Sequence, residues 1–205
     1  MRQRSVNRPA LWIVAGPNGS GKSTLYGTTE IQGFWGTVWI INPDALTARI
    51  CEREGLDLLA ANGDALDRIE RWLAASVDAY QTVGVETVLS TDKYRVLVDH
   101  AKSHGFDVQL LYVTLQSAEL NVERVKSRVL RGGHDVSEDK IHARRERSFQ
   151  QLPWFLERAD YALVFDNSGA KPVVLAEKVN GKFKVEDQAS NEIRSAIKTA
   201  ISLVH

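Results

Sequence analysis

The octapeptide at residues 16–23 constrains this chain more than any other segment. It reads Gly16-Pro17-Asn18-Gly19-Ser20-Gly21-Lys22-Ser23 and fits the pattern G-x-x-x-x-G-K-[ST] at every fixed position. Glycines at these positions allow the backbone to curl so that successive N–H groups point at phosphate oxygens. A helix that begins near Gly21 adds the positive end of its dipole. The segment therefore predicts a nucleoside triphosphate site; a flexible glycine loop without a ligand is the competing interpretation.

The side chains of this loop divide the work of binding. Lys22 brings a positive charge to the β- and γ-phosphate oxygens, and the Ser23 hydroxyl is the predicted metal ligand, for Mg²⁺. We assign to the nucleotide all of Gly16, Pro17, Asn18, Gly19, Ser20, Gly21, Lys22, Ser23 and Thr24. ATP and Mg²⁺ are the expected cofactors.

Short apolar runs alternate with longer stretches of helical periodicity. The predicted strands are 11–14, 38–41, 83–89, 108–113 and 163–165. The predicted helices are 65–80, 120–130 and one that Ser137 caps and that ends near Gln151, before Pro153. Continuous apolar strands joined by helices indicate a parallel sheet covered on both faces. We predict an α/β P-loop fold with a five-stranded parallel sheet in the order 2-3-1-4-5.

The C-terminal part has a different pattern. Asn180-Gly181 separates the strand-like runs 173–179 and 182–185, which predicts a hairpin, and 190–204 has helical spacing. We expect a single domain over 1–205, with this hairpin and helix (about 172–205) appended to the sheet.

Composition limits the possible partners. The chain has 205 residues, and its 26 basic and 26 acidic side chains cancel, so no overall field favours nucleic acid or a membrane. The apolar run at 11–15 is too short for a signal peptide or a membrane span. A cytoplasmic protein with no membrane partner is the expectation.

Asp44 directly follows the second predicted strand. Carboxyl ends of parallel strands line the ligand crevice, so Asp44 is expected near the γ-phosphate, where a carboxylate could orient an acceptor hydroxyl and take its proton. A structural role is equally compatible with the sequence. In that case Asn42-Pro43-Asp44 is a turn and Asp44 caps the next helix.

An acidic residue, Glu86, lies inside the third apolar strand. A buried carboxylate is costly unless it is paired or binds something. We favour acceptor binding or support of Mg²⁺ through a bound ligand, with a buried ion pair as the alternative. Together with Glu86, we assign Thr87 and Ser90 at this strand end to the acceptor.

Basic residues concentrate between Arg124 and Arg147. This segment has six arginines and two lysines against four acids, with Gly132-Gly133-His134 as a break. Two basic helices around a glycine hinge are typical of a lid that closes over a triphosphate. A solvated basic face is the alternative, and no aromatic residues interleave the arginines as a nucleic-acid site would require.

Other P-loop classes fit less well. The chain has neither an NKxD guanine motif nor an LSGGQ-type signature. Leu163-Val164-Phe165-Asp166 is similar to a Walker B strand, with Asp166 as a metal partner. We favour a role for Asp166-Asn167-Ser168 near the adenine, because this strand comes last and is expected far from Ser23.

With these segments in order, the chain resembles the zeta-toxin-like P-loop kinases, in particular their compact bacterial branch. The matching segments are AGPNGSGKST, NPD, ETVLS, RVKSRVLRGGHDV with the following I-x-x-R-x-x-R-S, and DNS, over roughly residues 11–168. Proline is common in the family where Ser137 stands, and an aromatic residue where Arg145 stands.

The resemblance implies transfer of the γ-phosphate of ATP to a hydroxyl of UDP-N-acetylglucosamine, and a small antitoxin protein as a possible partner. By position, Lys22, Asp44, Arg128 and Arg144 are the expected catalytic residues, with Asp44 as the base. Arg124 and Arg128 are expected to bind nucleotide, and Asp44, Glu86, Thr87, Ser90 and Arg147 the acceptor. Other acceptors (an antibiotic, a nucleoside or a polynucleotide 5′-hydroxyl) and an ATP-dependent binding module with a protein partner remain alternatives.

Overall fold

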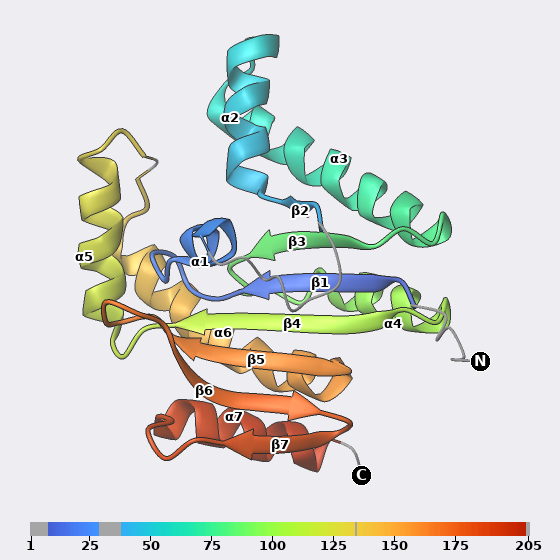
Figure 1. Cartoon of the computed structure of the whole chain (residues 1–205). Helices are drawn as coiled ribbons and strands as arrows, with labels where there is room; N and C mark the ends of the chain where they lie inside the picture. Colours follow the sequence, from blue (N-terminus) through green and yellow to red (C-terminus); the bar gives the residue numbers. More distant parts are fainter. Residues whose placement is uncertain (1–7, 29–37, 134, 204–205) are drawn as a thin grey trace.

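The strands in the described part of the chain form one sheet. The structure is a computed structural model that describes residues 8–28, 38–133 and 135–203. The strands are β1 (Ala10–Ala15), β2 (Ile40–Ile41), β3 (Val83–Thr87), β4 (Asp107–Thr114), β5 (Tyr161–Asp166), β6 (Val173–Val179) and β7 (Lys182–Val185). They are ordered β2-β3-β1-β4-β5-β6-β7 (Figure 1). The first five run parallel, in the order that the sequence predicts.

The C-terminal hairpin corrects one prediction. We expected a five-stranded parallel sheet with a hairpin appended, but β6 pairs antiparallel with β5 and β7 with β6, so the sheet is mixed and has seven strands. The predicted Asn180-Gly181 turn forms, with both residues at positive φ. Pairing with β6 covers the edge of β5 and buries Leu175 and Ala176 in the main core.

Seven helices surround the sheet in the described part of the chain. They are α1 (Lys22–Thr28), α2 (Pro43–Glu54), α3 (Leu58–Asp78), α4 (Arg95–Ser103), α5 (Ala118–Val129), α6 (Glu138–Arg158) and α7 (Asn191–Ser202). The last helix, predicted over 190–204, ends at Ser202 with Leu203 at its C-cap, and residue 204 lies outside the described residues. Ser190 caps α7 through its side chain, whereas Ser137 occupies the N-cap position of α6 without a side-chain capping bond.

Several boundaries differ from the sequence prediction, and two of these differences have a clear physical reason. Helix α6 continues through Pro153 instead of ending before it, because Leu152, Phe155 and Leu156 on either side of the proline are buried against the sheet. Their burial outweighs the roughly 3 kcal/mol that an internal proline costs. Strand β3 ends at Thr87 rather than at residue 89, because Leu89 has φ of 60° and cannot continue a strand.

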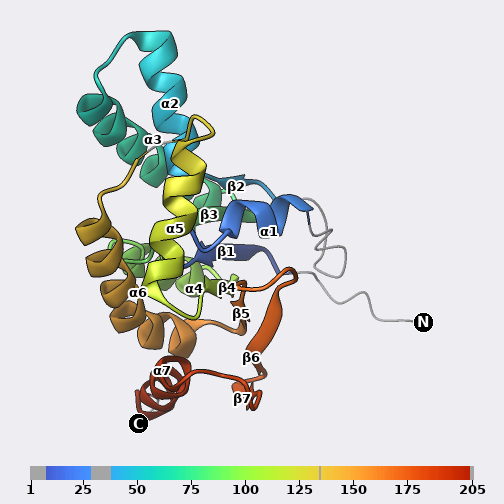
Figure 2. The same ribbon diagram turned by 90° about the vertical axis from the view of Figure 1, so that its left-hand side faces the viewer.

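The two faces of the sheet are covered unequally. On one face, Leu11 and Ile13 of β1 pack with buried residues of α3, α4, α6 and α7 in the main core. Figure 2 shows these helices on the same side of the sheet. Val14 of β1 points to the other face and packs with Leu25 of α1 in a smaller cluster. Successive side chains of β1 therefore anchor the strand in the clusters on both faces of the sheet, immediately before the loop that precedes α1.

Arg145 ties α6 to α7. Its guanidinium donates to both carboxylate oxygens of Glu192, at 2.8 and 3.0 Å, and to the Leu115 carbonyl at 3.1 Å. It also lies 4.7 Å from the ring centroid of Phe149. The Arg145 side chain is only 9% exposed. At this position, where the family resemblance leads us to expect an aromatic residue, the chain buries an arginine paired with a carboxylate.

We expect Arg145→Met to lower the free energy of unfolding by about 1–3 kcal/mol, because it removes charge-assisted hydrogen bonds and leaves the buried Leu115 carbonyl without this donor. Urea denaturation followed by circular dichroism measures the change. Arg147→Ala, on the exposed side of the same helix, is the matched control and should stay within about 0.5 kcal/mol of the parent chain. Equal effects of both substitutions would contradict the assigned role.

Candidate nucleotide and acceptor site

The loop between β1 and α1 has a backbone that only glycine permits at key positions. Gly16 and Gly19 have φ of 141° and 76°, and a Cβ atom would lie 2.0 Å from the Val113 carbonyl oxygen and 2.7 Å from the Asn121 carbonyl oxygen, respectively. Both contacts are far closer than atoms tolerate. The glycines of the motif therefore let the loop press closely against β4 and α5.

Two asparagines outside the motif hold this loop from behind. Asn121 of α5, fully buried, donates from Nδ2 to the Asn18 carbonyl at 2.7 Å. Asn167, directly after β5, donates to the Ser20 carbonyl at 2.8 Å. No sequence pattern predicts either contact. An Asx turn marks residue 167, but nothing in the local pattern distinguishes Asn121 from an ordinary helix residue.

Lys22 is buried at the base of the loop. Its Nζ donates to the carbonyl oxygens of Gly16 and Pro17, at 2.7 and 3.1 Å, and lies 3.9 Å from Glu86 Oε1. Burial lowers the pKa of the ammonium, and the carboxylates of Glu86 and Asp44 oppose that shift. A charge so poorly hydrated is well suited to bind an incoming phosphate oxygen.

Glu86 connects three of the predicted elements. Its Oε2 accepts from Ser23 Oγ at 2.8 Å and from Asn42 Nδ2 at 3.0 Å, while Oε1 faces Lys22. The acid that is anomalous in an apolar strand is thus paired, as its burial requires. A serine hydroxyl and a carboxylate side by side are hard oxygen donors, which fit Mg²⁺ that also binds phosphate and water.

Asn42, rather than Asp44, caps helix α2. The Asn42 side chain accepts from the main-chain N–H groups of Asp44 and Ala45, at 2.9 and 3.3 Å. The capping role that the sequence allowed for Asp44 therefore belongs to Asn42. Asp44 lies in the first turn of α2, exposed, and lines the same cleft as Lys22.

A cleft of about 840 Å³ brings most of the predicted residues together. It is lined by the predicted Asn18, Gly19, Gly21, Lys22, Ser23, Thr24, Asp44, Glu86, Thr87, Ser90, Arg124, Arg128 and Arg144. Gly16, Pro17, Ser20 and Arg147 are not among its lining residues. Arg131, in the predicted lid segment, and Asn167, in the predicted adenine loop, also line it. Lining residues for which the sequence predicts no ligand role are Asn42, Pro43, Asn62, Leu66, Val88, Thr91, Lys93, Tyr94, Ser127 and Gly169.

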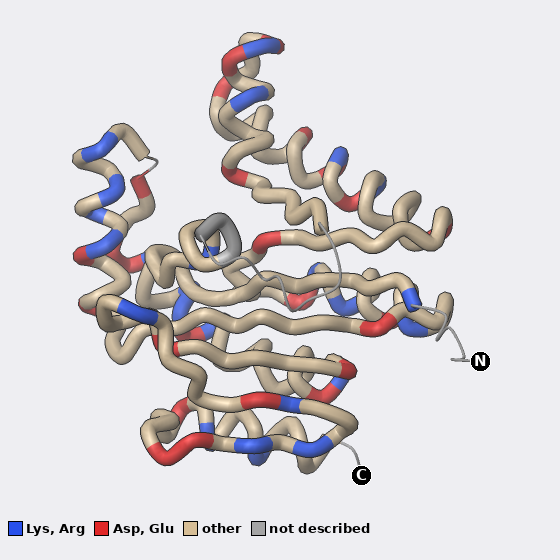
Figure 3. The backbone as a smooth tube through the Cα atoms, in the orientation of Figure 1, with Lys and Arg blue, Asp and Glu red and all other residues tan. Residues whose placement is uncertain are grey.

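The cleft is strongly basic in a chain of zero net charge. Lys22, Lys93, Arg124, Arg128, Arg131 and Arg144 line it, against the acids Asp44 and Glu86. Helix α5 carries a row of basic residues beside the loop, and α5 and α2 stand on either side of α1 (Figures 1 and 3). Such a surface attracts a polyanion. His134, in the break after α5, lies outside the described residues.

The loop after β5 approaches the nucleotide loop without Asp166 entering the cleft. Asp166 Oδ1 accepts from the main-chain N–H of Ser168 at 2.8 Å and from its hydroxyl, which is the predicted Asx turn. Strand β4 separates β5 from β1, which keeps Asp166 away from Ser23. Arg124 donates to the Ser168 carbonyl at 3.1 Å, so this loop and α5 flank the start of α1 together.

Comparison with known families agrees with this arrangement. A family model described as AAA domain matches residues 11–152, from β1 into α6. The chain belongs to this family. A Haemophilus influenzae relative, described as an uncharacterized protein, is 28% identical over 146 residues, which are 67% of this chain and 98% of the relative.

Two solved structures show the same fold as this AAA-domain chain. One is the AvrRxo1-ORF1:-ORF2 complex with ATP, with a TM-score of 0.63, 17% identity, and coverage of 94% of this chain and 64% of that chain. This chain thus spans less than two thirds of that structure's length. The other is from the PezAT toxin–antitoxin system of Streptococcus pneumoniae, with a TM-score of 0.60, 15% identity, and coverage of 98% and 88%.

These likenesses establish an α/β fold of the P-loop kinase type. At such low identities they carry no residue roles. Among the described residues, no helix has both the length and the apolar character needed to cross a membrane.

We expect Gly19→Ala to weaken ATP binding at least tenfold, because its methyl group would collide with the Asn121 carbonyl and move the loop off α5. Gly55→Ala is the matched control: Gly55 also has a positive φ, of 70°, but nothing lies within 4 Å of its Cβ position. It should cost about 1–2 kcal/mol of stability and leave binding unchanged. Isothermal titration calorimetry measures the ATP affinity of both variants. Equal ATP affinities of Gly19→Ala and Gly55→Ala would contradict the prediction.

Proposed function

We propose that this chain is an ATP- and Mg²⁺-dependent kinase that phosphorylates a hydroxyl group of a small anionic acceptor, with UDP-N-acetylglucosamine as the first candidate. The observation that carries the proposal is that Asp44 and the Lys22–Ser23–Glu86 network face one cleft. A site that only binds a triphosphate has no need of an exposed carboxylate in the same cleft as the lysine. We further propose that residues 1–205 act as one catalytic domain.

The donor side uses the loop and the arginines. The loop N–H groups and Lys22 hold the phosphates, and Ser23, supported by Glu86, is the protein ligand for Mg²⁺. The ion, when bound, neutralises charge on the β- and γ-phosphate oxygens. Arg124 lies next to the loop after β5, and Arg128 and Arg144 line the cleft, where they would stabilise negative charge on the transferred group.

The acceptor side is the part of the cleft between α2, α3 and the end of β3. The acceptor oxygen attacks the γ-phosphorus, the bond from that phosphorus to the β-phosphate oxygen breaks, and the acceptor proton passes to the Asp44 carboxylate. ADP and the phosphorylated acceptor are the products. Thr87, Ser90 and Lys93 lie within reach of this space and offer hydroxyl groups and a positive charge.

Backbone strain supports a binding role for the segment after β3. Leu89 is fully buried and has φ of 60°, a conformation that costs a branched apolar residue about 1–2 kcal/mol. The Thr87 hydroxyl accepts from the Leu89 N–H at 3.0 Å and stabilises the turn. The turn presents Ser90 and Thr91 to the cleft, and such strain is frequent at ligand sites.

The resemblance to zeta-toxin-like kinases suggests the sugar nucleotide, and the basic cleft fits its diphosphate. A protein partner of antitoxin type is compatible with the same resemblance, because the PezAT structure belongs to a toxin–antitoxin system. We place this chain in the compact branch of that group as part of the proposal.

We expect Asp44→Asn to lower kcat roughly 100-fold or more with ATP binding retained, since it removes the proton acceptor. Purified chain, ATP and Mg²⁺ are incubated with UDP-N-acetylglucosamine, nucleosides, antibiotics and a 5′-hydroxyl oligonucleotide, and products are weighed by mass spectrometry. Lys22→Ala should abolish product, and Asp67→Asn, an exposed acid outside the cleft, should not. Full turnover by Asp44→Asn would remove the base role, and ATP hydrolysis without any modified acceptor would favour a binding module.

The arginines of α6 provide a second test of the site. Arg144 lines the cleft, whereas Arg147 is exposed on the same helix and would meet an acceptor only after α6 moves toward it. We expect Arg144→Ala to lower kcat roughly 100-fold and Arg147→Ala to raise KM with kcat unchanged. Steady-state kinetics with the acceptor identified above separates the two effects. Unchanged kinetics in both variants would contradict the proposal that the basic segment between Arg124 and Arg147 closes over the triphosphate.

A further inference from the structure

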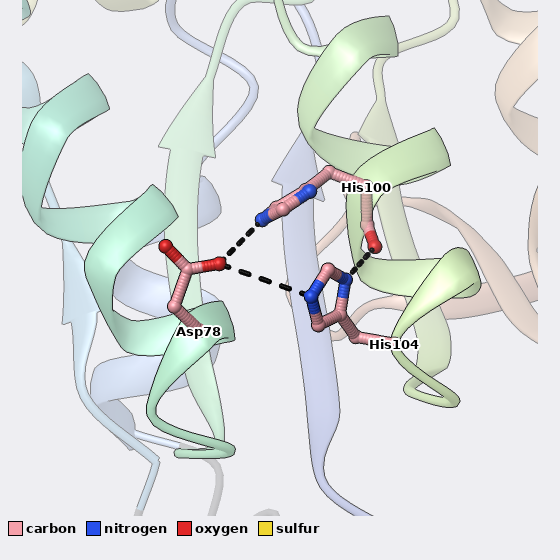
Figure 4. A group of neighbouring side chains, drawn as sticks. All are labelled: Asp78, His100 and His104. Carbon is pink, nitrogen blue, oxygen red and sulfur yellow. Dashed lines mark hydrogen bonds and ion pairs between the residues drawn. The ribbon is translucent and has the colours of Figure 1, made fainter.

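Three side chains that commonly bind metals converge far from the cleft. Asp78 is the last residue of α3, His100 lies in α4, and His104 occupies the C-cap of α4 (Figure 4). His100 Nε2 lies 2.8 Å from Asp78 Oδ1, and His104 Nε2 lies 3.9 Å from the same oxygen. One ligand atom from each residue falls within 4.8 Å of the other two.

The cluster is separate from the nucleotide and acceptor site. Helix α3 ends just before β3 begins, and α4 ends just before β4 begins. Both helix ends therefore lie at the amino ends of the parallel strands, while the cleft lies at their carboxyl ends (Figure 1). Nothing in the proposed kinase reaction uses Asp78, His100 or His104.

The hydrogen bonds of His104 determine which of its nitrogens carries the lone pair. His104 Nδ1 lies 2.9 Å from the main-chain oxygen of His100. A carbonyl oxygen only accepts, so Nδ1 carries the hydrogen, and in the neutral ring Nε2 carries the lone pair. This is the arrangement in which a metal-binding histidine is oriented by a main-chain carbonyl.

In that neutral form the Nε2 lone pair faces the Asp78 carboxylate, and either a proton on Nε2 or a metal ion between the two groups makes the contact favourable. An ordinary Asp78–His100 pair explains the 2.8 Å contact but not His104, whose Nε2 at 3.9 Å is beyond hydrogen-bond distance. The two imidazole rings also lie side by side, with centroids 4.3 Å apart. A cation shared by all three groups would account for the whole arrangement.

We propose that Asp78, His100 and His104 bind a divalent ion of the zinc class, with water in the fourth position. Two imidazole nitrogens and one carboxylate oxygen suit Zn²⁺, whereas Mg²⁺ prefers oxygen ligands alone. Tetrahedral zinc holds its nitrogen and oxygen ligands roughly 3.3 Å apart. The Asp78 side chain is 61% exposed, so its carboxylate has the freedom to make this adjustment.

The surroundings favour a cation and give it a structural role. The last carbonyl groups of α4 lie beside the two histidines, at the negative end of the helix dipole. Helices α3 and α4 pack against each other, and the ion would fasten their ends together. The exposed fractions of the histidine side chains, 34% and 32%, leave a path for the ion to enter.

Zinc titration of the purified, chelator-treated chain without an affinity tag tests the proposal. We expect one Zn²⁺ per chain with micromolar or tighter affinity in competition with a chromophoric chelator, and visible bands of four-coordinate Co²⁺ when Co²⁺ is used instead. His104→Ala and, independently, Asp78→Asn should weaken zinc binding at least about tenfold. His142→Ala, an exposed histidine of α6 outside the cluster, is the matched control.

Thermal unfolding adds a readout that does not depend on kinase activity. Zinc should raise the Tm of the parent chain and of His142→Ala, but not that of His104→Ala, since an ion bound only by the folded state stabilises it. Circular dichroism checks that each variant folds. Affinity in the millimolar range only, or the same affinity in His104→Ala and His142→Ala, would overturn the proposal.

Discussion

The parallel pairing of β1 with β3 is the constraint on which the site depends. Its register places Val14 beside Glu86 and Ala15 beside Thr87, so the loop after β1 starts next to Glu86 of β3. Glu86 then meets Lys22, Ser23 and Asn42 within 4 Å. A buried ammonium and a largely covered carboxylate are each costly alone, and they become tolerable as a pair with additional hydrogen bonds.

Short amide side chains make this arrangement rigid. Asn42 joins the cap of α2 to Glu86, Asn121 joins α5 to the loop, and Asn167 joins the segment after β5 to it. Each comes from a different segment of the chain, so the loop is fixed from several sides before any ligand binds. A loop held in this way loses little conformational entropy when phosphate arrives, and this favours binding.

The basic cleft and the Asp78–His100–His104 cluster lie at opposite ends of the parallel strands. The carboxyl ends face a basic cleft, while the amino ends carry the Asp78–His100–His104 cluster between α3 and α4. The main core, in which both helices bury one face, lies between these two ends. An ion at the amino ends would thus act on the stability of the scaffold and leave the chemistry of the cleft unchanged.

Features that rest on local rules are predictable from the amino-acid order alone. The phosphate loop follows from its glycines, the turn from Asn180-Gly181, and the strand order 2-3-1-4-5 was predicted correctly from the α/β pattern. Four features became visible only in the folded chain: α6 continues through Pro153, the hairpin extends the sheet, Arg145 pairs with Glu192, and Asn121 supports the loop. Contacts between residues tens of positions apart decide these features, because burial and pairing there outweigh local propensity, and no local pattern encodes such contacts.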